Sequence, residues 1–428
     1  MSTLIIIVFF VLIYILKSFS IDLGGLDQST SLALGFLLIT AFLFGKIVKK
    51  WKLPMITGFM LMGIVCGPYL LKLINFQEVK NLQLLDGLAL SLIALTAGGE
   101  LKIGILKQRK KAIILIILFQ SVFLLLGFLI FHFLSRNFLS FLVVKSLNNV
   151  FAFGLLFGVL AIATSPSTTI AIITETRAKG SLTDLVLSIT IFKDIIVIVL
   201  FAISLSFSRF LISENTNFNF SHLLNLSMEM MGSLLLGILV GLIIIFYLRF
   251  IKSEITIFIL SIAFFTYELS SHFELHPLLI CMIAGFLTEN FSSQGEKLIQ
   301  TIERSSLPIY VIFFAISGAS LNLEILKATW IIALSMVFLR AVLKFLGTYL
   351  GAKLAREELN IQKISWMGFI SQAGVALGIA IIIERSFPQW GAQFKALAIA
   401  VIAINQIIGP IMFQKIIFKS GEAGKKEI

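Results

Sequence analysis

Apolar runs long enough to cross a lipid bilayer follow one another along almost the whole chain, with only short polar segments between them. A spanning helix takes about 20 mainly apolar residues, and a helix satisfies its own backbone polar groups inside a membrane. We therefore expect an all-α polytopic membrane protein with about fourteen transmembrane helices. The runs lie near residues 3–19, 29–48, 53–71, 84–105, 112–134, 149–175, 181–206, 223–248, 254–270, 274–290, 307–322, 326–354, 362–384 and 391–417.

The composition excludes several classes of protein. Of the 428 residues, 58% are hydrophobic and 13% are charged, and that charged share is about half of what a soluble globular protein carries. The composition therefore excludes a soluble enzyme, a disordered chain and a nucleic-acid-binding protein. The net charge of +12 does not indicate a nucleic-acid partner, because most Lys and Arg residues stand in short clusters between the apolar runs.

The distribution of these basic residues predicts the orientation. Of the 34 Lys and Arg residues, 22 lie in the C-terminal segment or in loops that follow an even-numbered run, and 9 lie in loops that follow an odd-numbered run. Cytoplasmic loops carry the excess of Lys and Arg. We expect a multi-pass protein of the inner (plasma) membrane with both termini in the cytoplasm.

The remaining three cations, Lys193, Arg340 and Lys344, lie in the middle of apolar runs. A charge at this depth is costly and marks a candidate functional residue. Asp194 is the acidic residue that lies as deep and adjoins them, and Glu100 and Glu229 are secondary candidates. Neighbouring helix residues point about 100° apart, so Lys193 and Asp194 must face different partners. Arg340 and Lys344 share a helix face and need an anionic partner, for which we expect Asp194.

Two apolar runs contain a break. The run at 149–175 includes Thr164, Ser165, Pro166 and Ser167, and Pro166 removes a backbone donor. The freed carbonyls and hydroxyls can coordinate a hard cation, and the alternative is a proline kink satisfied by its hydroxyl neighbours. The run at 362–384 has a second weak point, which consists of Ser371, Gln372 and Gly374.

Interrupted helices at corresponding places in two halves indicate a transporter site. The third to eighth runs and the ninth to fourteenth runs form such halves, which predicts two inverted repeats with broken helices. In the twelfth run, Gly347 and Gly351 form a small-xxx-small pair, which lets another helix backbone approach closely.

Several segments, taken together, resemble the monovalent cation:proton antiporter superfamily, in particular its bacterial sodium/proton and Kef-like potassium/proton branch. The resemblance covers about residues 30–418. It rests on Leu53-Pro54 with Gly58, Gly63 and Gly67-Pro68, on Gly98-Gly99-Glu100-Leu101, on Ala163-Thr164-Ser165-Pro166, on Asp194, on Phe313-Phe314 with Gly318, on Lys344 with Gly347 and Gly351, and on the string from Gln372 to Gly378.

The resemblance implies an elevator-type antiporter with crossed broken helices that works as a homodimer. It implies a core of residues 112–206 and 326–417, scaffold or dimerisation helices at 30–105 and 254–322, and a linker helix at 223–248. Residues 30–418 would form the exchanger domain, 1–29 an extra N-terminal helix and loop, and 419–428 a short cytoplasmic tail.

The resemblance also implies roles for individual residues. Asp194 would bind either the cation or the proton, which would compete for it. Thr164 and Ser165 would offer oxygen ligands to the cation. Lys344 would stabilise the broken helices or the empty site. The sequence departs from the family at Lys193, where relatives place Asp, Asn or Gln. A charged Lys adds no ligand for a cation, so Lys193 either carries a proton or mimics a bound cation.

The expected function is exchange of Na⁺, Li⁺ or K⁺ for protons by alternating access, with a role in pH homeostasis. One alternative is an organic-anion transporter of the same fold, which the three buried cations favour. The other is a non-transporting sensor. An enzyme is not expected, because the four His residues lack the spacing of a metal site. No cofactor, resident metal or nucleotide-binding domain is expected on this chain.

Overall fold

The computed structural model describes residues 26–82, 84–135, 146–212, 221–251, 254–273, 275–292, 294–372 and 374–425, and all of its regular elements are helices. The predicted span at 3–19 lies outside these residues. The helices are α2 (Leu26–Lys50), α3 (Met55–Cys66), α4 (Phe76–Leu82), α5 (Leu84–Glu100), α6 (Ile103–Ser135), α7 (Leu147–Ile162), α8 (Pro166–Thr176), α9 (Ser181–Ile212), α10 (Ser221–Phe250), α11 (Ile255–His272), α12 (Pro277–Phe291), α13 (Gly295–Ala319), α14 (Leu323–Ala355), α15 (Leu359–Ile364), the 3-10 helix η1 (Ser365–Phe369), α16 (Gly374–Ser386) and α17 (Gly391–Ser420).

Each predicted span from 29–48 onward coincides with a helix or with a broken helix of this structure. Within the described residues, eight helices are long and apolar enough to cross a membrane, or nine if α4 and α5 form one bent span, and three apolar helices are shorter. The number fourteen therefore stays a prediction. Two helices begin well before their predicted spans: α6 begins at Ile103 and α13 at Gly295. Lys, Arg, Gln and Glu are good helix formers, so both helices continue beyond their apolar segments.

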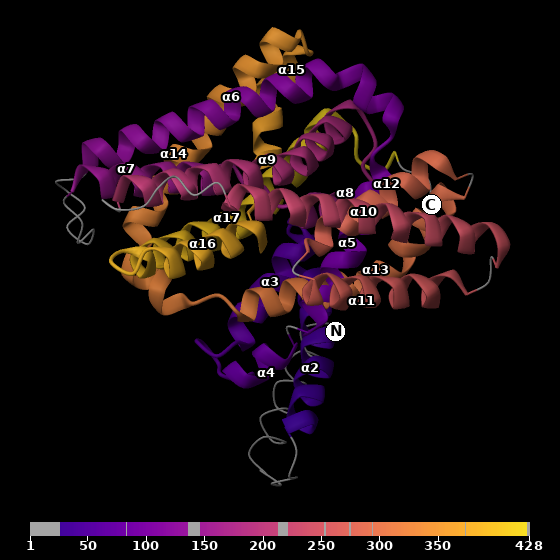
Figure 1. Cartoon of the computed structure of the whole chain (residues 1–428). Helices are drawn as coiled ribbons and strands as arrows, with labels where there is room; N and C mark the ends of the chain where they lie inside the picture. Colours follow the sequence, from indigo (N-terminus) through magenta and orange to yellow (C-terminus); the bar gives the residue numbers. More distant parts are fainter. Residues whose placement is uncertain are drawn as a thin grey trace.

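The helices pack in two groups. The first group consists of α6, α7, α9, α14, α16 and α17, and the second consists of α2, α3, α5, α10, α11, α12 and α13. In Figure 1, α7, α14, α16 and α17 lie to the left and α10–α13 to the right. Helix α8 contacts members of both groups, namely α9 and α17 on one side and α5 and α3 on the other.

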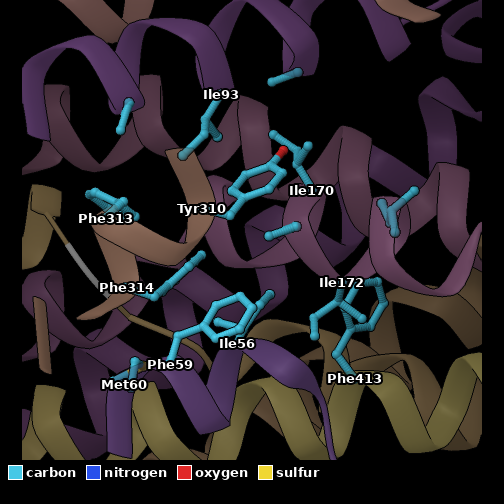
Figure 2. Packing of buried hydrophobic residues seen from close by; sticks show 14 of the residues in the cluster. Ile56, Phe59, Met60, Ile93, Ile170, Ile172, Tyr310, Phe313, Phe314 and Phe413 are labelled. Carbon is cyan, nitrogen blue, oxygen red and sulfur yellow. The ribbon is translucent and has the colours of Figure 1, made fainter. Parts of the chain in front are cut away.

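A continuous apolar core joins the two groups (Figure 2). From the second group it contains Ile56, Phe59 and Met60 of α3, together with Phe313 and Phe314 of α13. Side chains of α8 and α17 complete it from the other side, including Ile170, Ile172 and Phe413. All these side chains are at most 6% exposed, so dispersion and burial hold this interface together, and most of it requires no directional bond.

The predicted close approach at Gly347 and Gly351 is confirmed, and its partner is α6. A Cβ atom at Gly347 would lie 2.6 Å from the Cα of Gln120, and one at Gly351 would lie 2.6 Å from the Cα of Ile116. The two glycines therefore set the distance between α6 and α14, and they bring the buried polar side chains of these helices together.

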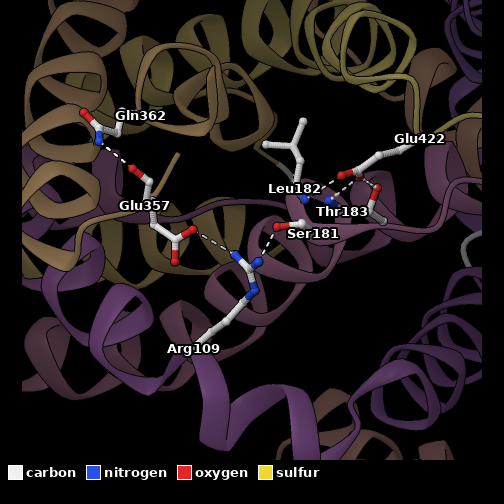
Figure 3. A network of polar contacts seen from close by, with 7 residues as sticks. All are labelled: Arg109, Ser181, Leu182, Thr183, Glu357, Gln362 and Glu422. Carbon is white, nitrogen blue, oxygen red and sulfur yellow. Dashed lines mark hydrogen bonds and ion pairs between the residues drawn. The ribbon is translucent and has the colours of Figure 1, made fainter. Parts of the chain in front are cut away.

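Polar contacts gather at one end of the bundle, which we call the basic end (Figure 3). Arg109 of α6 donates hydrogen bonds to Ser181 of α9 and, at 3.0 Å, to Glu357, which follows α14. Glu422, which follows α17, accepts from the backbone N–H groups of Leu182 and Thr183 at 2.7 and 2.8 Å. Glu422 thereby caps α9, and the loop that contains Arg177 and Lys179 contacts the C-terminal segment, because the backbone N–H of Lys179 donates to the carbonyl oxygen of Glu422 at 3.1 Å.

Candidate ion-binding site

The first predicted break is a full interruption of the helix. Helix α7 ends at Ile162, residues 163–165 are extended, and α8 begins at Pro166. Pro is favourable at a first helical position because its missing N–H would have no partner there. The Ser165 hydroxyl accepts hydrogen bonds from the Thr168 backbone N–H at 3.2 Å and from its hydroxyl at 3.0 Å. Ser165 is thus the N-cap of α8, and α7 and α8 together still form one apolar stretch of spanning length, residues 147–176.

The second predicted break lies beside the first. Helix η1 ends at Phe369 and α16 begins at Gly374. The backbone N–H of Ser165 donates to the carbonyl oxygen of Ser371 at 3.0 Å, which joins the two unwound segments. The Gln372 side chain donates to the Leu160 carbonyl at 2.9 Å and accepts from Asn405 at 2.9 Å.

Two residues of α17 that sequence reasoning missed support the second break. Asn405 bonds to Gln372, and Gly409 lies so close that a Cβ there would be 2.5 Å from the Cα of Ser371. The polar Asn405 inside the last apolar run was the available signal, since a polar side chain at membrane depth needs a partner.

Arg340 and Lys344 do not pair with Asp194, so the expected charge pairing is wrong. The Arg340 guanidinium, 0% exposed, donates to the carbonyl oxygens of Ala161 (2.9 Å), Ala163 (2.8 Å) and Ile370 (2.6 Å). The Lys344 ammonium donates to the Thr164 hydroxyl at 3.1 Å and to the Phe369 carbonyl. The partial negative charges at the ends of α7 and η1 take the place of the expected carboxylate.

Lys193 and Asp194 face different partners, as predicted from the helix geometry. The Lys193 amine is buried, donates to the side-chain oxygen of Gln120 on α6, and lies 4.3 Å from the ring centroid of Phe369. The Gln120 amide in turn donates to the hydroxyl of Thr348 on α14. Sequence reasoning missed Gln120, although an amide in the middle of the apolar run at 112–134 was a visible signal.

Asp194 faces a cavity of about 280 Å³ between the two helix groups. Pro166 and Ser167 of α8 line it from the same side, and residues of α5, α10 and α12 line it from the other. Apart from Asp194, Ser167 and His276, the lining is apolar. Asp194 is 8% exposed, and its Oδ1 atom has no hydrogen-bond partner. A buried carboxylate with an open oxygen can take up a proton or a cation.

The structure thus separates the predicted site residues into two sets. Asp194, Pro166 and Ser167 line the cavity. The second set forms a polar network around the two breaks and consists of Lys193, Thr164, Ser165, Arg340, Lys344, Ser371 and Gln372, while Gly374 begins α16. Because Thr164 and Ser165 are engaged in this network, Ser167 is the hydroxyl residue that lines the cavity together with Asp194.

The secondary candidates lie elsewhere. Glu100 is the last residue of α5 and is absent from the cavity lining. Glu229 of α10 lies with its Oε2 atom 3.7 Å from Nε2 of His276, which lines the cavity. Within the described ranges, no three His, Cys, Asp or Glu side chains are grouped so that they could hold a metal ion.

Comparison with known families gives one match that covers most of the chain. The family model for the transmembrane part of sodium/hydrogen exchangers matches residues 37–419. The chain belongs to the sodium/hydrogen exchanger family. This family falls within the antiporter superfamily that the sequence motifs indicated.

Individual relatives agree with this assignment. The chain is 22% identical over 395 residues to the probable Na⁺/H⁺ antiporter 3 of Methanocaldococcus jannaschii, covering 88% of this chain and 93% of that protein. Two structures of the sodium proton antiporter MjNhaP1 from the same organism have a similar fold. One, at pH 8, has a TM-score of 0.64 at 19% identity and covers 91% of this chain and 96% of that one. The other has a TM-score of 0.67 at 20% identity and covers 91% and 94%.

Proposed function

We propose that this member of the family exchanges a monovalent cation (Na⁺, Li⁺ or K⁺) for protons across the membrane, with Asp194 as the shared binding site. The observation that carries the proposal is the Asp194 carboxylate itself. It lines an otherwise mostly apolar cavity, and one of its oxygens has no hydrogen-bond partner. An oxygen ligand with a negative charge suits a hard cation, and the same oxygen holds a proton when the cation leaves.

Ser167 and the apolar walls complete the proposed site. The Ser167 side chain lines the same cavity as Asp194 and offers a second oxygen to a bound cation. Few polar groups surround the carboxylate, so proton and cation compete directly for it.

We further propose that the site changes sides by alternating access of the elevator type. In this cycle the first helix group carries Asp194 along the second group. The apolar interface of Figure 2 suits such a movement, because apolar contacts are non-directional and re-form after a displacement. The backbone bond between Ser165 and Ser371 would keep the two breaks together as they move.

We propose that the basic end lies in the cytoplasm of a cell with this protein in its inner (plasma) membrane, and the distribution of Lys and Arg in the sequence predicts cytoplasmic termini. Asp194 would then be reached from outside in the described conformation, because His276, the residue before α12, lines its cavity. The homodimer implied by the resemblance remains part of the proposal, and the mass of the purified protein in detergent tests it.

The organic-anion alternative receives no support from the geometry. Lys193, Arg340 and Lys344 are turned toward Gln120 and backbone carbonyls, and none of the three lines the cavity. An anion entering this cavity would meet Asp194 and none of these three buried cations.

The proposal is tested with purified protein in liposomes that carry an imposed pH gradient. We expect added Na⁺, Li⁺ or K⁺ to dissipate the gradient and a panel of carboxylates to leave it intact. Dissipation by carboxylates alone would favour the anion transporter, and no response to any solute would favour the sensor.

A further inference from the structure

We infer that Glu229 and His276 form an entry site for the transported cation at the mouth of the Asp194 cavity, and that a proton on His276 closes this site. The inference rests on the proposed exchange function and adds the route by which the cation reaches Asp194.

His276 occupies the place in the cavity where a cation can enter. Only three of the side chains that line the cavity are polar. Asp194 and Ser167 lie on one side of it, and His276, the residue that precedes α12, lies on the other. Its side chain is 32% exposed, whereas Asp194 is 8% exposed. His276 is therefore the more accessible of these polar groups, and we place the mouth of the cavity beside it, so that a cation moving to Asp194 passes its ring.

Helix α10 holds His276 in place. The backbone N–H of His276 donates to the Ser233 hydroxyl at 3.0 Å, and this hydroxyl donates to the Glu229 carbonyl at 2.7 Å. One turn along the same helix, the Glu229 carboxylate oxygen Oε2 lies 3.7 Å from His276 Nε2. Nε2 is buried and has no hydrogen-bond partner. Nε2 of His276 thus points to the Glu229 carboxylate. Among the described residues, no other hydrogen-bond partner of Nε2 would compensate a positive charge on the ring.

The charge of this pair depends on one proton. With His276 neutral, the negative charge of Glu229 is uncompensated and attracts a cation to the mouth of the cavity. With His276 protonated, the pair is neutral and the attraction is lost. Histidine is the side chain whose ordinary titration falls in the physiological pH range, so this site opens at alkaline pH and closes at acid pH.

Few other charges act on the pair. Within the described part of the chain, the other titratable group that lines the cavity is Asp194 on α9, and Glu268 and His272 near the end of α11 are exposed outside the lining. The buried cations of the first helix group do not line the cavity. A change at the pair should therefore alter the apparent KM for the cation and leave the maximal rate almost unchanged, because the pair contacts neither Asp194 nor the two breaks.

The test measures exchange in oriented proteoliposomes as a function of cation concentration on the cavity side, at about pH 5 and about pH 8. The variants are Glu229→Gln and His276→Gln, and the matched control is Glu268→Gln, an exposed carboxylate on α11. At the higher pH we expect Glu229→Gln to raise KM about fivefold and His276→Gln to match the wild type. At the lower pH we expect His276→Gln to lower KM by a similar factor relative to the wild type.

The controls separate this inference from the proposed function. Proton competition at Asp194 persists in every variant, so only differences from the wild type report on the pair. The inferred entry site is refuted if both variants have the wild-type KM at both pH values, or if Glu268→Gln has the effect expected of Glu229→Gln. The proposed exchange function is not affected by either outcome. If the wild type exchanges no cation at all, the proposed function fails, and the entry site fails with it.

Discussion

The backbone N–H of Ser165 donates a hydrogen bond to the carbonyl oxygen of Ser371 at 3.0 Å, and this bond joins two broken helices directly at their unwound segments. Arg340 reinforces the junction, because one guanidinium binds the carbonyl oxygens of Ala161 and Ala163 on one side and of Ile370 on the other. A junction of this kind keeps irregular backbone satisfied at membrane depth.

The first prediction concerns this junction. Arg340→Lys keeps a positive charge but loses the planar fork that reaches three carbonyls. Each buried carbonyl left without a donor costs about 1–3 kcal/mol, so we expect a large loss of thermal stability and of folded protein in detergent. Arg385→Lys, an exposed arginine on α16, is the matched control and should behave as wild type. Equal stability of the two variants would contradict the structural role of Arg340.

The second prediction concerns Asp194. Asp194→Asn removes the ionised oxygen and the exchangeable proton but keeps the size of the side chain, so exchange should be lost while the protein still folds. The measurements are exchange in liposomes and the elution profile of the purified protein. Asp184→Asn, the same substitution nearer the start of α9, is the control and should retain exchange. Undiminished exchange in Asp194→Asn would refute the assigned site.

The third prediction concerns the contact between α6 and α14. Gly347→Ala would place a methyl group 2.6 Å from the Cα of Gln120, and overpacking of this kind costs about 1–3 kcal/mol. Gly378→Ala meets no atom within 4 Å, and it should be neutral or stabilising because Ala favours helix over Gly. Thermal unfolding in detergent should therefore give a lower midpoint for Gly347→Ala than for Gly378→Ala. Similar midpoints for the two variants would argue against the close contact between Gly347 and Gln120.

The fourth prediction concerns a contact between the helix groups toward the basic end. The backbone N–H of Met55, the first residue of α3, donates to both carboxylate oxygens of Glu175 on α8, at 2.9 and 3.0 Å. A hydrogen bond to a charged group contributes about 1.5–3 kcal/mol. If α8 moves past α3 during transport, this bond stabilises only the conformation described here, and Glu175→Ala should depopulate it.

Accessibility measures this effect. In a background without Cys66 and Cys281, we expect a membrane-impermeant thiol reagent to label Ser167→Cys from the cavity side. Adding Glu175→Ala should slow this labelling severalfold. Glu422→Ala is the matched control, because Glu422 caps α9 from the segment after α17, within the first helix group. It should lower stability by about 1–2 kcal/mol and leave the labelling rate unchanged. Equal labelling in all three proteins would show that the Glu175 contact does not select the conformation.

The sequence by itself determined the class of fold and most of the helices. Apolar runs of spanning length admit few alternatives in a membrane, and the breaks at Pro166 and near Ser371 were visible because proline, hydroxyl and amide groups stand out in such runs. The depth of Lys193, Asp194, Arg340 and Lys344 was visible for the same reason.

Only the tertiary structure decided which groups meet. Arg340 and Lys344 bind backbone carbonyls rather than Asp194, and Lys193 binds Gln120. Backbone carbonyls carry no signature in the sequence, since any residue supplies one and only the local conformation frees it. The pairing of Gln120 with Thr348 depends on how closely α6 and α14 approach at Gly347. Helix periodicity fixes the face on which a side chain lies, but the packing of distant helices fixes its partner.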